Sequence, residues 1–349
     1  MKVFTRRGPS NGRILCDPAV AFGKESSILQ TPVAFIIFNR PDRTARVFAE
    51  IAKARPAKLL IVADGPRADR PGEDEECLAA RSVVDQIRWP CEVLTNFADT
   101  NLGCRRRVSS GLDWVFEQVE EAIILEDDCL PHETFFPFCE QLLEKFRDDE
   151  RVGMICGSNF QSGKRRSPYS YFFGLHVSVW GWASWRRVWR TYDVEMRRWP
   201  QLRDTSWLSD LLVNPVAVKY WQETFESAFR GECDTWDWQL FFSWWSENML
   251  ALIPDRNLVS NIGFGSGATR THDALPSMAN LAVKPMDFPL RHPPSVSLNR
   301  EADDYSFRQI YPWLIENQNY YWQLRHKFTA SLPDGLRQKV REFRSKLRG

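Results

Sequence analysis

Three consecutive acidic residues, Glu126, Asp127 and Asp128, form the group in this sequence best suited to chemistry. They directly follow the apolar run 122–125, which predicts a buried strand. Adjacent carboxylates repel one another, and burying them without a partner is costly, so a cation is their natural companion. Oxygen ligands of this kind suit Mg²⁺ or Mn²⁺, which commonly take one or two protein carboxylates together with substrate phosphates. The alternative is a solvated turn or a helix start.

A basic segment, residues 101–107, precedes a predicted helix over 109–119 and reads Asn-Leu-Gly-Cys-Arg-Arg-Arg. Arginines at the start of a helix oppose the helix dipole, which favours anions there. A bound phosphate would relieve that conflict, held by backbone amides beside Gly103 and by a guanidinium such as that of Arg105. The alternative is pairing with surface acids, which we expect for at least one of these arginines.

The elements that must position these groups follow from the alternation of apolar runs with segments of helical spacing. Strands are expected at 33–38, 59–63, 91–94 and 122–125, and helices around 47–51, 77–87, 109–119, 218–229 and 236–245. Continuous apolar strands separated by helices indicate a parallel sheet covered on both faces. Ligands of such sheets bind at the carboxyl ends of the strands, which here carry Asn39, Asp64 and the acidic triplet.

Taken in order, four motifs resemble those of the GT-A type nucleotide-sugar glycosyltransferases. They are Phe-Asn-Arg-Pro at 38–41, Asp-Gly at 64–65, Asn-Leu-Gly-Cys at 101–104 and Leu-Glu-Asp-Asp at 125–128. The resemblance covers roughly residues 31–275, and it is closest to the group related to N-acetylglucosaminyltransferase I and to bacterial sugar transferases. It implies a GT-A (Rossmann-like) α/β fold, in which helices cover both faces of a mixed, mostly parallel twisted sheet.

The resemblance also implies a role for each motif. The last acid of the triplet, Asp128, would ligate the metal that bridges the donor diphosphate. The other two acids would contact the donor sugar and ribose, and Asp64 would contact the base. The full set expected to bind the donor is Phe38, Asn39, Arg40, Asp64, Asn101, Gly103, Arg105, Glu126 and Asp127.

The catalytic base is expected at Asp237, because the segment 235–239 resembles the one that carries this carboxylate in inverting members of the family. Two flanking tryptophans would desolvate the acid and strengthen it as a base. The alternative is an acid that caps the helix starting there. Asp234 and Glu232 are nearby rivals for the same role.

The glycine-rich segment 263–272 predicts a loop that closes over the diphosphate, with Arg270 or His272 supplying charge or a metal ligand. It lacks the Lys-Ser/Thr ending of a Walker loop. Eleven of the 15 tryptophans lie between Trp180 and Trp245. Most of them are expected in the core, and no more than two are expected to stack on sugar rings.

Composition excludes several classes of protein. Because 46 Lys+Arg balance 45 Asp+Glu, for a net charge of +1, the chain lacks the basic footprint of a general nucleic-acid binder. No apolar run has the length of a signal peptide or of a membrane span, so a cytoplasmic location is predicted. The eight cysteines contain no CxxC pair and are expected to be small buried hydrophobes.

Three regions are predicted along the chain: an N-terminal extension over 1–30, a GT-A domain over 31–300 and a C-terminal helical region over 301–349. The domain would divide into a nucleotide-sugar half, 31–130, and an acceptor half, 131–300. The last 25 residues hold eight Lys/Arg and two acids. They form either a basic amphipathic helix on the inner face of a membrane or a helix in solvent or in an oligomer contact.

These features predict a hexosyl- or N-acetylhexosaminyltransferase of polysaccharide biosynthesis. It would use a nucleoside-diphosphate sugar, with a UDP-sugar favoured, and transfer the sugar with inversion. The acceptor hydroxyl would belong to a saccharide or a lipid-linked saccharide. One alternative is a sugar nucleotidyltransferase, although the glycine- and lysine-rich signature of that class is missing. The other is a non-catalytic carbohydrate-binding protein.

Overall fold

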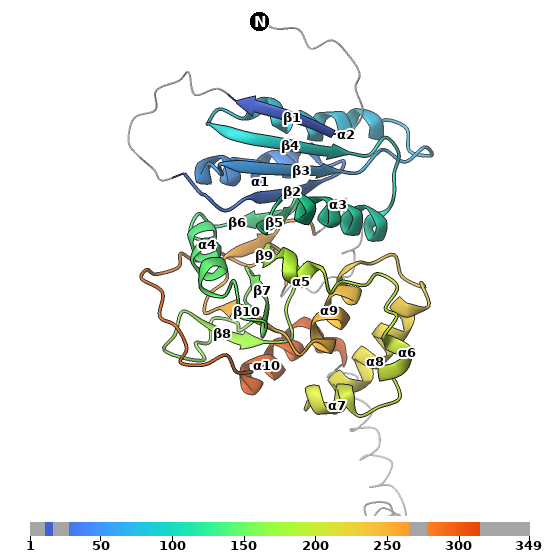
Figure 1. The fold of residues 1–349 in the computed structure, drawn as a ribbon, viewed down its shortest axis with the longest axis vertical. Helices are drawn as coiled ribbons and strands as arrows, with labels where there is room; N and C mark the ends of the chain where they lie inside the picture. Colours follow the sequence, from blue (N-terminus) through green and yellow to red (C-terminus); the bar gives the residue numbers. More distant parts are fainter. Residues whose placement is uncertain (1–10, 17–27, 265–277, 315–349) are drawn as a thin grey trace, which may run out of the picture. The chain divides into compact units, whose positions relative to one another are not determined.

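A nine-stranded sheet organises the computed structural model (Figure 1), which describes residues 11–16, 28–264 and 278–314. The chain divides into two compact units, 1–306 and 307–349. The sheet lies in the first unit and contains β1 (Asn11–Cys16), β2 (Val33–Ile37), β3 (Lys58–Ala63), β4 (Cys91–Phe97), β5 (Glu121–Glu126), β7 (Val152–Cys156), β8 (Tyr171–Gly174), β9 (Trp182–Trp185) and β10 (Leu250–Pro254). A separate two-stranded sheet pairs β6 (Cys129–Pro131) with β11 (Val259–Asn261).

The helices lie between these strands and after them. They are α1 (Pro41–Ala54), α2 (Glu73–Arg81), α3 (Cys104–Gln118), α4 (Phe135–Lys145), α5 (Arg186–Trp189), α6 (Trp199–Leu202), α7 (Trp207–Leu211), α8 (Pro215–Phe229), α9 (Asp237–Ser246) and α10 (Arg300–Ile310). A 3-10 turn, Ser82–Gln86, continues α2. Among the described residues, no helix is both long and apolar enough to cross a membrane.

The order of the sheet is β1-β4-β3-β2-β5-β9-β7-β10-β8. The pairs formed by β2 with β3, β3 with β4, β2 with β5 and β7 with β10 are parallel. Because β9 is antiparallel to both β5 and β7, six of the nine described strands run in the same direction. The prediction of a mixed, mostly parallel sheet is therefore confirmed.

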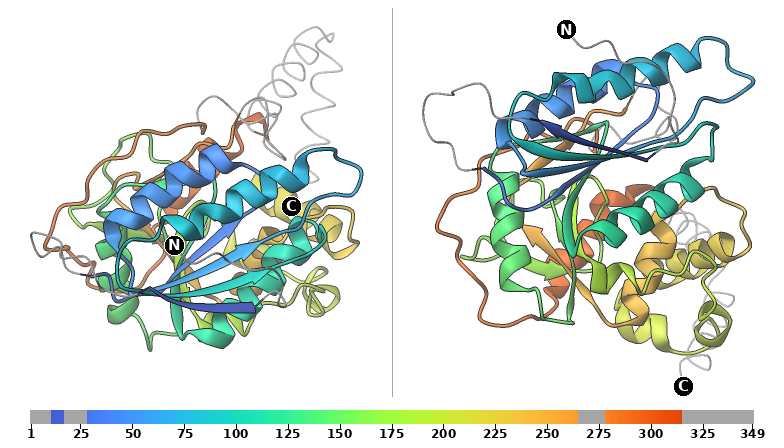
Figure 2. Two further views of the ribbon diagram at one scale, coloured as in Figure 1. Left: turned by 90° about the horizontal axis from the view of Figure 1, so that it is seen from above. Right: turned by 45° about the horizontal axis from the view of Figure 1, so that its top comes forward.

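The chain reverses its direction of travel across the sheet between β4 and β5. From β2 it moves outward through β3 to β4, and α3 then carries it back to the other side of β2. Right-handed crossovers consequently place α1 and α2 on one face and α3 on the opposite face, as Figure 2 shows. The carboxyl ends of β2 and β5 thus lie where the chain reverses its direction, and sheets of this kind bind ligands in a crevice at such a point.

Burial follows the sequence pattern. All five residues of β2 are buried, as are the last five of β3, because helices cover both faces of this part of the sheet. In the second half of the first unit the core is aromatic, and eight of the eleven tryptophans between Trp180 and Trp245 are buried. The expectation that most of them belong to the core is confirmed. Within the described residues seven cysteines are free, and five of those are buried.

A buried contact between Asp303 and His176 joins α10 to the segment after β8. Asp303 Oδ2 lies 2.9 Å from His176 Nδ1, and Asp303 Oδ1 accepts hydrogen bonds from the backbone amides of Leu175 and His176 at 2.6 and 2.9 Å. Burial opposes ionisation, but His176 and these amides hold the pKa of Asp303 below its ordinary value of 3.8. Its stabilising contribution is therefore present above that value and is lost as the pH falls through the lower pKa of the folded state.

We expect Asp303→Asn to lower the free energy of unfolding at pH 7 by about 3 kcal/mol, because it removes one charge of a buried pair. Urea denaturation measures this change. Glu301→Gln, on an exposed side chain of the same helix, is the matched control and should change stability by less than about 0.5 kcal/mol. Equal losses of unfolding free energy in the two variants would show that the buried contact of Asp303 adds no more to stability than an exposed side chain does.

Candidate functional site

The acidic triplet lies at the carboxyl end of β5, beside the carboxyl end of β2. Ile36 of β2 pairs with Glu126 of β5, so the residues that follow the two strands face each other. The backbone amide of Phe38 donates a hydrogen bond to Asp127 Oδ2 at 3.2 Å. Parallel strands end at one edge of the sheet, and this geometry therefore brings the first and last of the four motifs together.

The side chain of Arg40 links the segment that follows β2 to the acids at the end of β5. Its guanidinium donates to Asp127 Oδ1 and, at 2.9 Å, to Asp128 Oδ2. Burial would lower the pKa of Arg40, but the charges of Asp127 and Asp128 raise it above its ordinary value. The arginine predicted to lie along a nucleoside is thus the ionic partner of the triplet in this structure.

One guanidinium does not balance three carboxylates. Burial, together with repulsion from Asp128 and Asp127, raises the pKa of Glu126 to about 8. Burial also raises the pKa of Asp127 to about 6, although Arg40 opposes that rise. A group of acids whose pKa values are raised in this way gains by binding a further cation.

The short sheet formed by β6 and β11 places a second segment of chain against the triplet. Its register pairs Asn261 with Cys129, and the amide of Ile262 donates to the carbonyl of Asp128 at 2.8 Å. A Cβ atom added at Gly263 would lie only 2.8 Å from Asp128 Cγ and closer still to one carboxylate oxygen. A side chain at position 263 would therefore fit only if the Asp128 carboxylate moved.

We expect Gly263→Ala to weaken metal-dependent binding of a nucleoside diphosphate by roughly tenfold to a hundredfold, because the methyl group must push the Asp128 carboxylate aside. Calorimetry with UDP and Mn²⁺ measures the loss. A thermal unfolding midpoint close to that of the wild type would show that the fold is retained. Unchanged affinity would show that the orientation of the Asp128 carboxylate does not matter for binding.

Asp64 ties the loop after β3 to the loop before α3. It is buried, and Oδ1 accepts from the amides of Gly65 and Leu102, both at 2.9 Å, while Asn101 Nδ2 donates to Oδ2 at 3.0 Å. Burial raises the pKa of Asp64, and these hydrogen bonds oppose the rise. The Asp-Gly motif at 64–65 and the Asn-Leu-Gly-Cys motif at 101–104 are thus brought together. Groups of these two motifs already bind the Asp64 carboxylate by hydrogen bonds.

Two residues beside Phe38 and Asn39 were not foreseen from the sequence. Glu73, the first residue of α2, is buried and accepts a hydrogen bond from Asn39 Nδ2 at 3.0 Å. Arg67 pairs with Glu73 and lies over the Phe38 ring, 5.5 Å from its centroid. Burial opposes ionisation of Glu73, but hydrogen bonds from Arg67 and Asn39 lower its pKa overall. The only signal in the sequence was the run of acids that opens α2.

The exposed carboxylate of Asp234 binds the backbone at the start of α3. Asp234 accepts hydrogen bonds from the backbone amides of Cys104 and Arg105, at 3.2 and 3.0 Å. The Arg105 guanidinium donates to the carbonyl of Val194 at 2.7 Å. In this structure Asp234 therefore accepts hydrogen bonds from the amides that were predicted to hold a phosphate beside Gly103. Phosphate binding at these amides stays a prediction.

The three arginines before the predicted helix lie inside α3 and differ in environment. Arg107 is buried and donates to the carbonyls of Ala63 and Asn96 at the ends of β3 and β4. Burial lowers the pKa of Arg107 to about 10. Arg106 is exposed, and Arg105 lies 3.8 Å from Glu195, as expected for at least one pairing with a surface acid.

Asp237, the expected base, is the first residue of α9 and comes from the second half of the unit. Its charge is the smallest of the causes that raise the pKa of Glu126, after burial and the charges of Asp128 and Asp127. Thr235 Oγ1 donates a hydrogen bond to Asp237 Oδ1. Of its rivals, Asp234 serves the start of α3, and Glu232 is an exposed residue 4.0 Å from Arg230.

One tryptophan of the second half, Trp180, is partly exposed. Trp180 packs edge-on against Phe264 and Phe160, with ring centroids 5.5 and 5.8 Å apart. It lies just before β9, whose Trp182 pairs with Ile124 of β5. Aromatic faces of this kind can stack on sugar rings.

The donor set fits a hard divalent cation held in part by substrate. The triplet offers oxygen ligands and more carboxylates than the one arginine paired with it, and both features suit Mg²⁺ or Mn²⁺. Within the described ranges no group of three or more His, Cys, Asp or Glu side chains is arranged to hold a metal, so a cage made only of protein is not present there. His272 and Arg270, and the basic segment over 325–349, lie outside the described residues.

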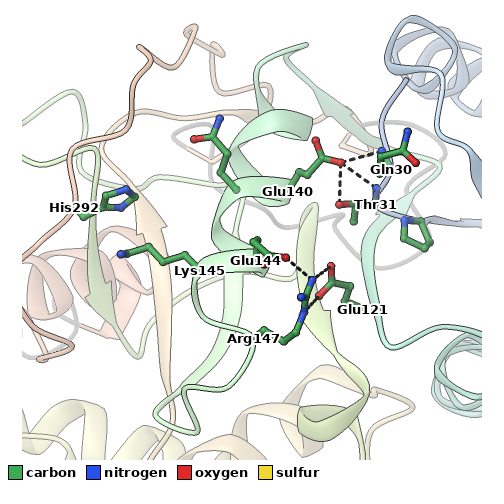
Figure 3. Close-up of a pocket in the computed structure, with 10 residues that line it drawn as sticks. Gln30, Thr31, Glu121, Glu140, Glu144, Lys145, Arg147 and His292 are labelled. Atoms are coloured by element: carbon green, nitrogen blue, oxygen red, sulfur yellow. Dashed lines mark hydrogen bonds and ion pairs between the residues drawn. The ribbon is translucent and has the colours of Figure 1, made fainter. Parts of the chain in front are cut away.

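A separate pocket of about 690 Å³ lies at the opposite ends of the strands, and Figure 3 shows its lining. Glu140 accepts from the amides of Gln30 and Thr31, and Arg147 bridges Glu121 and Glu144. None of the residues predicted to bind donor or metal lines it. Three of the charged residues that line it, Glu121, Glu144 and Arg147, form ion pairs with one another.

The sequence matches no protein-family model and none of the curated proteins. Among solved structures, the chain is similar to UDP-glucose pyrophosphorylase complexed with UDP-glucose. The identity is 7%, the match covers 46% of this chain and 79% of that chain, and the TM-score is 0.27. A likeness of this size carries no argument about fold family or activity.

Proposed function

We propose that the chain is a glycosyltransferase that moves a sugar from a nucleoside-diphosphate sugar to a hydroxyl group, with inversion at the anomeric carbon. One observation carries the proposal. Three acids lie together at the carboxyl ends of β2 and β5, and Arg40 is the one arginine that pairs with them in the described part of the chain. Such a group of acids suits a site where a cation and the diphosphate of a charged donor bind together, and Asp237 is proposed as the base for a neutral acceptor.

The donor would lie across the carboxyl ends of β2 and β5, with its diphosphate near Asp128. Mg²⁺ or Mn²⁺ held by Asp128 would act as a Lewis acid for the charge that develops on the leaving diphosphate. Glu126 and Asp127 would face the donor sugar and ribose, and the loop that carries Phe38 would lie along the nucleoside. The UDP-sugar preference, like these contacts, is part of the proposal.

The acceptor hydroxyl would bind between the donor sugar and Asp237. The Asp237 carboxylate takes the hydroxyl proton while the oxygen attacks the anomeric carbon from the face opposite the diphosphate. The bond from this carbon to the diphosphate breaks, and the electron pair leaves with the nucleoside diphosphate. Attack from the opposite face inverts the configuration.

A saccharide, free or lipid-linked, is the acceptor that the surroundings favour. Trp180 is a partly exposed aromatic residue just before β9, and sugar rings stack on such faces through their C–H groups. A cytoplasmic location belongs to the proposal. Contact of the 325–349 segment with a membrane surface remains one of its two predicted roles.

A nucleotide-sugar screen tests the donor half of the proposal. Thermal unfolding is measured with UDP-, GDP- and dTDP-sugars, each with and without Mn²⁺. A ligand at 100 times its Kd stabilises by about 2.7 kcal/mol, so a true donor raises the melting temperature measurably. We expect the shift only with the nucleotide sugar and Mn²⁺ together. Absence of any shift across the panel would contradict donor binding.

A further inference from the structure

We propose that Arg40 is an internal counter-ion of the acidic triplet, and that a divalent cation must displace it from Asp128, so that Arg40 sets the affinity of the site for metal. The inference rests on the proposed function, because it takes Mg²⁺ or Mn²⁺ as the cation that the triplet recruits. It assigns Arg40 a role different from the nucleoside contact implied by the family resemblance.

The two arms of the Arg40 guanidinium reach two different carboxylates. One nitrogen pairs with Asp127, which is almost fully buried, and the other lies 2.9 Å from Oδ2 of the more accessible Asp128. Arginine's planar fork suits such a double contact, whereas the single ammonium of lysine does not. The pair with Asp127 can therefore persist when the pair with Asp128 is broken.

Asp128 Oδ2 has little free space around it. The Arg40 guanidinium approaches it on one side, and Gly263 leaves no room even for a methyl group beside it. A metal held by this oxygen would bring two cations together on one carboxylate. Their mutual repulsion means that the guanidinium must withdraw from Asp128 when a metal binds there.

The backbone of Arg40 is fixed, while its side chain is held mainly by charge. The Arg40 carbonyl accepts hydrogen bonds from the amide and the hydroxyl of Thr44, both at 2.9 Å, at the start of α1. Arg40 Nε is buried and has no hydrogen-bond partner in the described part of the chain. A rotation of the side chain about this fixed backbone would therefore break ion pairs but no hydrogen bond of Nε.

The test is the affinity for Mn²⁺ alone, measured by titration of the electron paramagnetic resonance signal of free Mn²⁺ at pH 8. Arg40→Gln should bind Mn²⁺ about tenfold more tightly than the wild type or better, because it removes a competing charge close to the ligand. Arg40→Lys should fall between the two proteins. Arg46→Gln, the same charge change on an exposed side chain of α1, should leave the affinity unchanged.

Thermal unfolding of each variant, with and without Mn²⁺, shows whether the fold is retained, and Arg40→Lys preserves the charge should the glutamine variant fold poorly. Wild-type binding with unchanged or weaker Mn²⁺ affinity in both Arg40 variants would overturn the counter-ion role and leave the proposed function standing. A failure of every protein to bind Mn²⁺, with or without UDP, would overturn both.

Discussion

Replacing Asp237 with asparagine should leave donor affinity intact and lower kcat by roughly 10²- to 10⁴-fold, the range expected for loss of a general base. The substitution keeps the shape of the side chain and its position at the start of α9. It removes only the ability to accept a proton from the acceptor hydroxyl. Steady-state kinetics with donor and acceptor, together with calorimetric titration of UDP and Mn²⁺, separates turnover from binding.

Two neighbouring acids provide the controls for this experiment. Glu232→Gln changes an exposed carboxylate and should be nearly neutral. Asp234→Asn keeps an oxygen that can accept from the amides of Cys104 and Arg105, so its effect should be mild. A severe loss in either control, with near-normal turnover in Asp237→Asn, would move the base to that residue.

Replacing Asp128 with alanine should abolish Mn²⁺-dependent binding of a nucleoside diphosphate while the protein remains folded. Asp128 lies after the end of β5 and is partly exposed, so its loss leaves no cavity in the core. The substitution removes the proposed metal ligand and one ion pair of Arg40. We expect the affinity for UDP in the presence of Mn²⁺ to fall at least 10²-fold, to the level measured without metal.

Calorimetry with UDP, with and without Mn²⁺, measures this loss in the wild type and the variant. Asp42→Asn, an exposed acid at the start of α1, is the control for a general change of charge near the acidic triplet. Equal UDP affinity in wild type and Asp128→Ala would leave the triplet as a turn held by Arg40, with no part in metal binding.

Much of the first half of the sheet could be predicted from sequence because β2, β3 and β5 are buried over most of their length and appear as continuous apolar runs. β4 instead alternates buried and half-buried residues at its start, and the four expected strands correspond to β2, β3, β4 and β5. The order of the motifs then predicted which loops meet, since parallel strands end at one edge. The hydrogen bond between Phe38 and Asp127 is the local result of that rule.

The second half of the sheet could not be predicted in the same way. Its strands are short, and the pairing of Ile155 with Ala183 joins segments far apart in the chain. Strand propensity depends on such neighbours, and the aromatic sequence of β9 gives no clear period. The strand β1, which pairs with β4, was missed within the predicted N-terminal extension for the same reason.

The partners of the site residues depend on tertiary contacts that no motif contains. The helix expected from residue 109 begins at Cys104, so the arginines lie in its first turns. The free amides of that first turn then bind Asp234, a residue 130 positions later. Likewise, a local motif cannot show that Arg40 would pair with the acids after β5, because only the fold brings those loops together.

Acceptor-dependent release of nucleoside diphosphate tests the proposed function most directly. The wild type is incubated with the nucleotide sugar that binds best, Mn²⁺ and a panel of saccharide acceptors, and free nucleoside diphosphate and pyrophosphate are quantified. The proposal predicts release of nucleoside diphosphate that requires an acceptor and is lost in Asp237→Asn. Formation of a nucleotide sugar and pyrophosphate from a nucleoside triphosphate and a sugar phosphate, with no acceptor-dependent release, would contradict it and identify a nucleotidyltransferase instead.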